Sequence, residues 1–328
     1  MKQGSGEETW LVERGLGPLL PGERGIARRV RFHQSWLRLN IMGIESYGIL
    51  ESRSPKPLGS VLPEREAKEG RNFVGNLAHV EYLARRKEGW GVDPVRCLQY
   101  LTSSQTLTIN LLASLKANPR WLLACFSKLL HRDDLLTVRA CAIEYAPASP
   151  AALLGDRTRV DTLIEFETEA GLLAVVMEVK YTDRMNSRKI AIHRNERYIE
   201  LGESTSLWTD AEGVLNSTRM NQLARCHALG VAYARQQSQG SKYECALVVV
   251  HHAADLAATS ILDEYGESLA NPRSLAGFQL SDFVSAMAST APDAAALKTC
   301  DELRVRYASE SVSESLWQEF LQECGSKG

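Results

Sequence analysis

The architecture of this protein follows from the segment Val160–Lys180, which reads VDTLIEFE-TEAG-LLAVVMEVK. Residues 160–167 alternate apolar and polar side chains, as a half-buried strand does. Residues 172–180 form an apolar run that turns polar only at its end. The short polar loop between them contains Gly171, the residue type that most readily adopts a positive φ. The segment therefore predicts a β-hairpin.

The register of this hairpin can also be predicted. If residues 168–171 form the loop, Asp161 lies directly across from Glu178. Opposed Cβ atoms are about 5 Å apart, so two like charges there repel unless a cation neutralises them. Lys180 lies two residues beyond Glu178 and shares its face, because side chains alternate along a strand. Two carboxylates and one ammonium should therefore meet at the polar end of the hairpin, where a hard divalent cation would bind well.

This pattern resembles the PD-(D/E)XK signature of the restriction-endonuclease-like nucleases. Asp161 matches its first acid and Glu178-Val179-Lys180 its (D/E)XK triplet, while Val160 stands where the signature usually has proline. The resemblance implies an α/β fold with a mixed central sheet, flanked by helices, in which an antiparallel hairpin carries the site. It also implies that both acids and Lys180 are catalytic. The same acids, with the Val179 carbonyl, would hold Mg²⁺ or Mn²⁺.

The composition is that of a soluble globular protein. A chain of 328 residues suffices for one large domain or two ordinary ones, and its formal net charge is −2. Any nucleic-acid binding must therefore come from local basic patches. Neither a secretory leader nor a long apolar run is evident, so we expect a cytoplasmic protein with no membrane partner. The seven cysteines lack CxxC spacing, which fits reduced thiols, and those at 125, 226 and 245 are expected in the core.

The N-terminal seventy residues are rich in Gly, Pro and Ser, so we expect an irregular basic extension over 1–70. It contains the stretch RGIARRVRFHQSWLR at 24–38. In one interpretation Arg28, Arg29 and Arg31 contact phosphates, aided by stacking of Phe32 and Trp36. In the other, the stretch is an amphipathic helix with a solvated basic face and both aromatic rings in the core.

From residue 71 the pattern is mainly helical. Apolar residues at 73, 77, 80 and 83 predict one helical stripe, Asp93-Pro94 predicts the start of a second helix, and a third covers about 120–131. Residues 138–145 and 244–250 read as strands, and the chain beyond about 275 reads as helices. The nuclease domain is thus predicted over 71–328, with helical parts at 71–131 and 275–328.

Glu144 could add a third acid to the site, because its predicted strand precedes the hairpin. A solvent-facing or ion-paired glutamate is the simpler alternative. The resemblance also extends, over about residues 25–250, to a group of uncharacterised bacterial putative restriction endonucleases. It rests there on the stretches 31–36, 72–73 and 103–111. In such folds the helix before the hairpin often supplies a polar side chain, which here would be Gln105 or Asn110, although a buried hydrogen bond explains either residue equally well.

Two further groups of candidate site residues follow the hairpin in the sequence. The resemblance implies that a helix after the hairpin brings a polar residue toward the scissile phosphate, and Gln222 and Arg225 are the matching positions. Arg188 and Lys189 belong to a positively charged stretch that follows Lys180, where a backbone phosphate would lie. A charged helix surface is the compatible alternative for these two residues.

The patch and the resemblance together predict a metal-dependent nuclease that hydrolyses phosphodiester bonds. The resemblance implies DNA as the substrate and an endonuclease of restriction or phage defence, and cleavage of both strands would commonly require a homodimer. Two alternatives remain open. The fold could serve as a catalytically silent DNA-binding or structural subunit. Alternatively, the three charged residues could form an exposed ion cluster that contributes little to stability.

Overall fold

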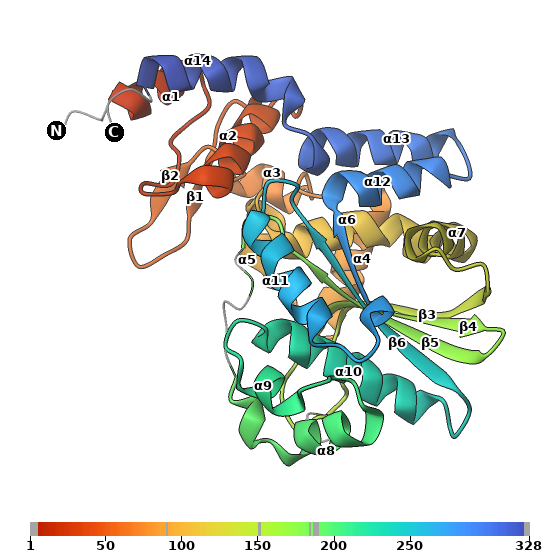
Figure 1. The fold of residues 1–328 in the computed structure, drawn as a ribbon. Coiled ribbons are helices and arrows are strands. Elements are labelled where there is room, and N and C mark those ends of the chain that lie inside the picture. Colours follow the sequence, from red (N-terminus) through yellow and green to blue (C-terminus); the bar gives the residue numbers. More distant parts are fainter. Residues whose placement is uncertain (1–5, 90, 150–151, 184, 186–189, 325–328) are drawn as a thin grey trace.

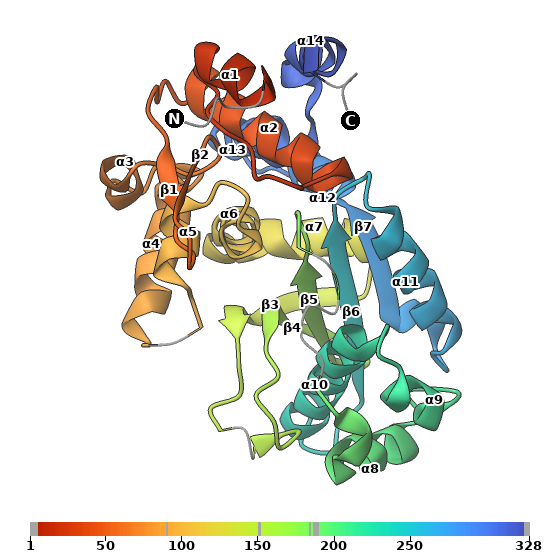
Figure 2. The same ribbon diagram turned by 90° about the vertical axis from the view of Figure 1, so that its left-hand side faces the viewer.

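The computed structural model describes residues 6–89, 91–149, 152–183, 185 and 190–324. Within these residues the centre is a five-stranded mixed sheet with the order β3-β4-β5-β6-β7, of which Figure 1 labels β3 to β6 and Figure 2 also β7. The strands are β3 (Leu135–Tyr145), β4 (Val160–Thr168), β5 (Gly171–Val179), β6 (Tyr243–His251) and β7 (Leu275–Gln279). Strand β4 is antiparallel to both of its neighbours, β3 and β5, and β6 and β7 continue the sheet parallel to β5. The predicted α/β fold with an antiparallel hairpin in a mixed sheet is confirmed.

The hairpin of β4 and β5 has the predicted register. Thr162 pairs with Met177, so Asp161 and Glu178 stand opposite each other one position further out. The chain turns after Thr168, which pairs with Gly171. This confirms the register inferred from the alternation of side chains.

Gly171 is required at the start of β5. Its φ is 145°, and a Cβ at this position would lie 2.2 Å from the carbonyl oxygen of Lys242. Lys242 leads directly into β6, which runs parallel to β5. The glycine therefore lets the turn and the neighbouring strand come together.

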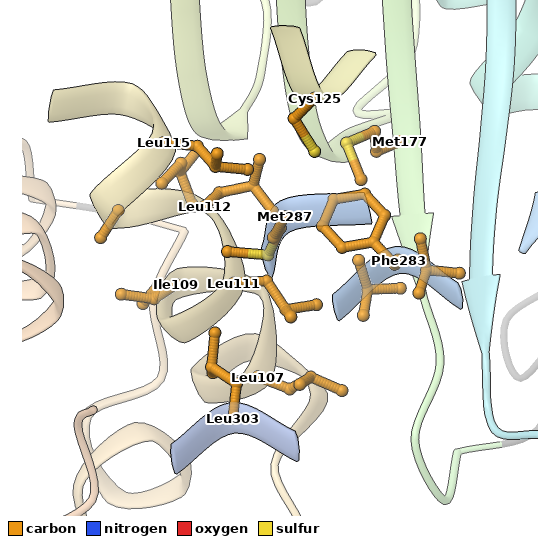
Figure 3. Close-up of a cluster of buried hydrophobic side chains, with 14 of the residues drawn as sticks. Leu107, Ile109, Leu111, Leu112, Leu115, Cys125, Met177, Phe283, Met287 and Leu303 are labelled. Atoms are coloured by element: carbon orange, nitrogen blue, oxygen red, sulfur yellow. The ribbon is translucent and has the colours of Figure 1, made fainter. Parts of the chain in front are cut away.

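Helices cover both faces of the sheet (Figures 1 and 2). One face is packed by α4 (Gly75–Lys87), α6 (Ser104–Ala117), α7 (Pro119–Leu130), α12 (Leu280–Ser289) and α13 (Ala294–Leu303). The other is packed by α8 (Glu196–Thr205), α9 (Ala211–Asn216), α10 (Asn221–Gln237) and α11 (Leu256–Glu267). Met177 of β5 faces the first layer and Val176 the second, so the apolar run of β5 is buried on both sides. Figure 3 shows the first core, where leucines of α6 meet Phe283 and Met287 of α12.

The predicted start of the second helix is confirmed. Helix α5 (Pro94–Gln99) begins with proline, and the Asp93 side chain accepts a hydrogen bond from the amide of Arg96 at 3.0 Å. This is the N-cap that the Asp-Pro pair predicts.

The stripe predicted at positions 73, 77, 80 and 83 is wrong. Helix α4 begins after position 73, and its side chains at 77, 80 and 83 are each about half exposed. Ala78 and Tyr82 form the buried face instead, with α6 as a neighbour. An apolar period identifies a helix, but the elements that pack on it decide which face is covered.

The expectation of helices alone beyond residue 275 is also wrong, because β7 occupies Leu275–Gln279 and pairs with β6. This strand is short, and its side chains are only partly buried or exposed. It therefore lacks the apolar run that revealed β6. The helices predicted after it are present.

The terminal segments of the chain pack on each other. Helices α1 (Gly6–Glu13) and α2 (Gly25–Asn40) meet α14 (Glu314–Cys324) through a core that includes Trp10, Phe32 and Phe320. The remaining elements before α4 are β1 (Gly48–Leu50), β2 (Lys56–Leu58) and α3 (Glu64–Lys68). Residues 25–40 are thus helical, although they belong to the extension predicted as irregular. The boundary at residue 70 stays a prediction.

Short helical turns complete the fold. They are the 3₁₀ turns Ile192–Arg194, Pro272–Ser274 and Ser311–Ser313, and a π-helical turn at Arg304–Ala308 that follows α13. None of the helices in the described part of the chain combines the length and apolar character needed to cross a membrane.

Candidate active site

Three carboxylates stand in a row across neighbouring strands of the sheet. The β3–β4 register places Glu144 opposite Asp161, and the β4–β5 register places Glu178 opposite Asp161 from the other side. The charges of both glutamates act on Asp161, since each raises its pKa. The strand ends therefore bring together Asp161, Glu178 and Glu144, the acids that the sequence analysis names as candidates.

Glu178 is the most heavily bonded of the three acids. Its Oε1 lies 2.5 Å from Lys180 Nζ and also accepts a hydrogen bond from Gln222 Nε2. Its Oε2 accepts from the thiol of Cys226 at 3.5 Å. Gln222 and Cys226 lie one turn apart on α10, so this helix orients Glu178 while Lys180 balances its charge. Glu178 and Lys180 are both buried, unlike the members of an exposed ion cluster.

Asp161 is oriented by the strand opposite. Its Oδ2 accepts a hydrogen bond from the backbone amide of Val179 at 2.7 Å. The side chain thus takes the place of a backbone acceptor where the hairpin ladder ends. This contact fixes Asp161 beside the (D/E)XK triplet.

Glu144 is buried in an unusual backbone conformation. It is 5% exposed and has a φ of 55°, which is rare for a residue other than glycine. Its Oε2 accepts from Gln105 Nε2 at 3.2 Å, and its carbonyl accepts from Arg85 at 2.5 Å. Its Oε1 has no hydrogen-bond partner among the described residues. Gln105 therefore reaches the site through Glu144 rather than directly.

Burial dominates the electrostatics of the site. It raises the pKa of Asp161 well above its ordinary value, and the Glu178 and Glu144 carboxylates raise it further. Burial likewise raises the pKa of Glu144 to about 7. Burial lowers the pKa of Lys180, but the Glu178 and Asp161 carboxylates outweigh this effect and the net shift is upward. The ammonium thus stays charged, while two of the acids hold protons more readily than in water.

The arginines predicted to bind phosphate have partners within the protein. Arg28 pairs with Glu7 at 2.6 Å, Arg29 with Glu314 at 2.9 Å, and Arg31 with Glu23 at 2.6 Å. The stretch 24–38 is thus largely the amphipathic helix of the second interpretation, with Phe32 in the core. Its basic face is ion-paired rather than freely solvated. Contact of these arginines with phosphate stays a prediction.

Of the other candidate residues, two have partners within the protein and two lie outside the described residues. Arg225 is buried, and its Nε donates to Asn221 Oδ1 at 3.2 Å. Asn110 is buried and donates to the hydroxyl of Tyr307 at 2.8 Å, so its alternative interpretation applies. Arg188 and Lys189 lie outside the described residues. Phosphate contacts of Arg225, Arg188 and Lys189 stay predictions.

The sequence did not lead us to expect Cys226 as a neighbour of the site. Cys226 is buried, as expected of a core cysteine, and its thiol also contacts Glu178. Its spacing of four residues from Gln222 on a predicted helix is the signal that could have revealed it, because such residues share a helix face.

The fold and the site define a class of protein: an α/β protein with opposed acids and a buried lysine at the end of a hairpin. The sequence model described as the PD-(D/E)XK nuclease superfamily matches residues 21–309. The chain therefore belongs to the PD-(D/E)XK nuclease superfamily. The match begins within the segment predicted as an extension and includes α2. No curated protein and no solved structure shows significant similarity to the chain.

Proposed function

We propose that the protein is a divalent-metal-dependent nuclease that hydrolyses phosphodiester bonds of DNA, with Asp161, Glu178 and Lys180 as its catalytic residues. The observation that supports this proposal is the opposition of Asp161 to the buried Glu178, with the buried Lys180 bonded to Glu178. Membership in the superfamily implies a nuclease and a nucleic-acid substrate. DNA, an endonuclease action, a role in restriction or phage defence, and a homodimer are the finer parts of the proposal.

The residues present fit Mg²⁺ or Mn²⁺. Hard cations prefer oxygen ligands, and Asp161, Glu178 and the Val179 carbonyl would hold the ion. The described residues form no cluster of three or more Asp, Glu, His or Cys side chains that could enclose a metal. Glu144 would add a third carboxylate beside Asp161, and its buried Oε1 has no hydrogen-bond partner among the described residues. When bound, the cation would polarise a phosphodiester oxygen and lower the pKa of water.

The protein's own side chains supply the positioning and part of the charge. Lys180 carries a positive charge in a buried setting, where it would stabilise negative charge that develops on the phosphate and orient the attacking water. Gln222 and Cys226 hold the carboxylate of Glu178 from α10. Such contacts behind metal ligands keep the ligand in one orientation, so they favour metal binding at one defined place.

The test is cleavage of plasmid DNA, linear DNA and RNA with Mg²⁺, Mn²⁺ or EDTA. We expect DNA cleavage that requires the metal and that falls at least about 100-fold in Asp161→Asn and Lys180→Met. Glu167→Gln is the matched control, because this half-exposed acid lies on the same strand as Asp161 and pairs only loosely with Arg139 at 3.6 Å. Its activity should equal that of the wild type.

Three outcomes would change the proposal. Cleavage that persists in EDTA, or in both active-site variants, would exclude the mechanism. Cleavage of RNA but not of DNA would mean that the substrate is RNA. An inert wild-type protein that binds DNA would favour the catalytically silent subunit.

A further inference from the structure

Tyr181 directly follows Lys180 and is 1% exposed. The backbone of this pair is fixed from two sides: the Lys180 amide donates to the Val250 carbonyl at 2.8 Å, and the Tyr181 amide lies 3.4 Å from Ser104 Oγ. The Tyr181 ring meets that of Tyr307 edge to face, with centroids 5.4 Å apart. The residue after the lysine is therefore anchored in the interior, not free at the end of a strand.

The hydroxyl of Tyr181 joins two segments that are far apart in sequence. Gln34 of α2 donates its Nε2 to the hydroxyl at 2.8 Å and to the Arg306 carbonyl at 2.6 Å. The hydroxyl in turn donates to the same carbonyl at 3.4 Å. Gln34 and Arg306 are both buried. Three polar groups thus form a closed triangle behind the end of β5.

The π-helical turn explains why an acceptor is available there. The last carbonyls of a helix lack intrahelical partners, and π turns interrupt the regular ladder. Val305 and Arg306 lie in this turn, and α2 satisfies both: His33 Nε2 lies 2.9 Å from the Val305 carbonyl, and Gln34 bonds that of Arg306. In Figure 2, α2 lies above the ends of β5 and β6. Gln34 of this helix bonds the Tyr181 hydroxyl.

The side chain of Arg306 carries the network to the helices before the sheet. Arg306 donates to Asn72 Oδ1, and Asn72 Nδ2 donates to the Cys97 carbonyl at 2.8 Å. Asn110 bonds both the Asn72 carbonyl, at 3.2 Å, and the hydroxyl of Tyr307. The stretches 31–36, 72–73 and 103–111, which carried the wider resemblance, therefore meet in one buried polar network next to Lys180.

We infer that Tyr181 is a positioning residue for Lys180, and that Gln34 and the π-helical turn hold Tyr181 for that purpose. The inference rests on the proposed nuclease function. A lysine side chain is long, so its ammonium is placed only if the backbone at its base is fixed. The contacts of Tyr181 supply that fixed base, which makes α2 and the C-terminal turn part of the catalytic unit.

The experiment compares Tyr181→Phe and Gln34→Met with Tyr265→Phe. Tyr265 is the matched control because it is also fully buried and its hydroxyl also has partners, Trp208 at 3.1 Å and His227 at 3.2 Å, but it lies in the layer around α10 and α11. Single-turnover cleavage is measured at saturating DNA and Mg²⁺, with the DNA affinity, the half-saturating Mg²⁺ concentration and the thermal midpoint. Amide hydrogen exchange of the peptide 176–183 is measured in parallel.

We expect Tyr181→Phe and Gln34→Met to lower the cleavage rate about tenfold or more with unchanged DNA affinity and Mg²⁺ requirement, and to speed exchange in 176–183. Tyr265→Phe should lose about as much thermal stability as the two test variants but keep the wild-type cleavage rate. Wild-type cleavage and exchange in both test variants, or an equal loss of rate in Tyr265→Phe, would overturn the inference. An inert wild type would overturn the nuclease function instead, and the exchange rates would then decide whether the network orders this segment.

Discussion

Replacing Glu144 by glutamine should stabilise the metal-free protein above about pH 7. Glu144 is buried, its backbone has a φ of 55°, and its Oε1 lacks a hydrogen-bond partner among the described residues. Glutamine keeps the size and shape of the side chain but carries no charge. The substitution therefore removes the cost of burying an ionised carboxylate and changes little else.

The magnitude follows from the pKa of Glu144. Burial raises it from 4.5 to about 7; the hydrogen bond from Gln105 opposes this rise, and the Glu178 carboxylate adds to it. Between these two values the unfolded chain has released a proton that the folded protein still holds. The stability that the acid contributes therefore falls as the pH rises through this window and stays low above it. The pKa difference corresponds to at most about 3 kcal/mol, which bounds the gain from Glu144→Gln.

The assay is urea unfolding in EDTA at pH 4, 6 and 8. The two proteins should be equally stable at pH 4, and the variant should be more stable by about 1–3 kcal/mol at pH 8. Glu169→Gln, at the exposed hairpin turn, is the control and should change stability by less than about 0.5 kcal/mol at every pH. A variant no more stable than the wild type at pH 8 would refute the reasoning. Adding Mg²⁺ at pH 8 should narrow the gap, since a bound cation offsets the buried charge.

Three further predictions concern the support of the site. Gln222→Met removes a donor to Glu178, so the Mg²⁺ concentration for half-maximal cleavage should rise about tenfold with little change in thermal midpoint; an unchanged requirement would exclude the role given to Gln222. Gly171→Ala should lower the free energy of unfolding by more than about 1 kcal/mol relative to Gly240→Ala. Gly240 also has a positive φ but has open space around it, so equal losses in the two variants would mean that the clash with Lys242 is relieved. Arg38→Met should lower the free energy of unfolding by about 3 kcal/mol or more, because this fully buried guanidinium bonds backbone carbonyls of three separate loops. The exposed Arg65→Met should be nearly neutral, and a mild effect at Arg38 would contradict its bridging role.

The hairpin was predictable because its information is local. Alternation with period two, one glycine and two short segments define which residues pair, and the structure has the same register. The apolar stripe of α4 was not predictable in this way. Leu77 and Val80 are exposed while Ala78 is buried, because α6 packs against the face of α4 that carries Ala78.

The site divides along the same line. Asp161, Glu178 and Lys180 come from one hairpin, so strand geometry alone brings them together. The spacing of Gln222 and Cys226 indicated a shared helix face, but only the packing of α10 on the sheet shows that this face meets Glu178. The orphaned oxygen of Glu144 depends on contacts from α4 and α6 that no local pattern encodes.

By itself the sequence determined the strand-turn-strand unit and the acids and lysine at its end, because these depend on side-chain periods over about twenty residues. The tertiary structure alone decided that Gln34 and Arg306, 272 positions apart, bond to each other and to Tyr181. It also decided that the arginines of α2 pair with acids of the terminal segments. Buried polar groups must find partners, but which partner is near is fixed only when the layers pack, and the sequence carries no period for that.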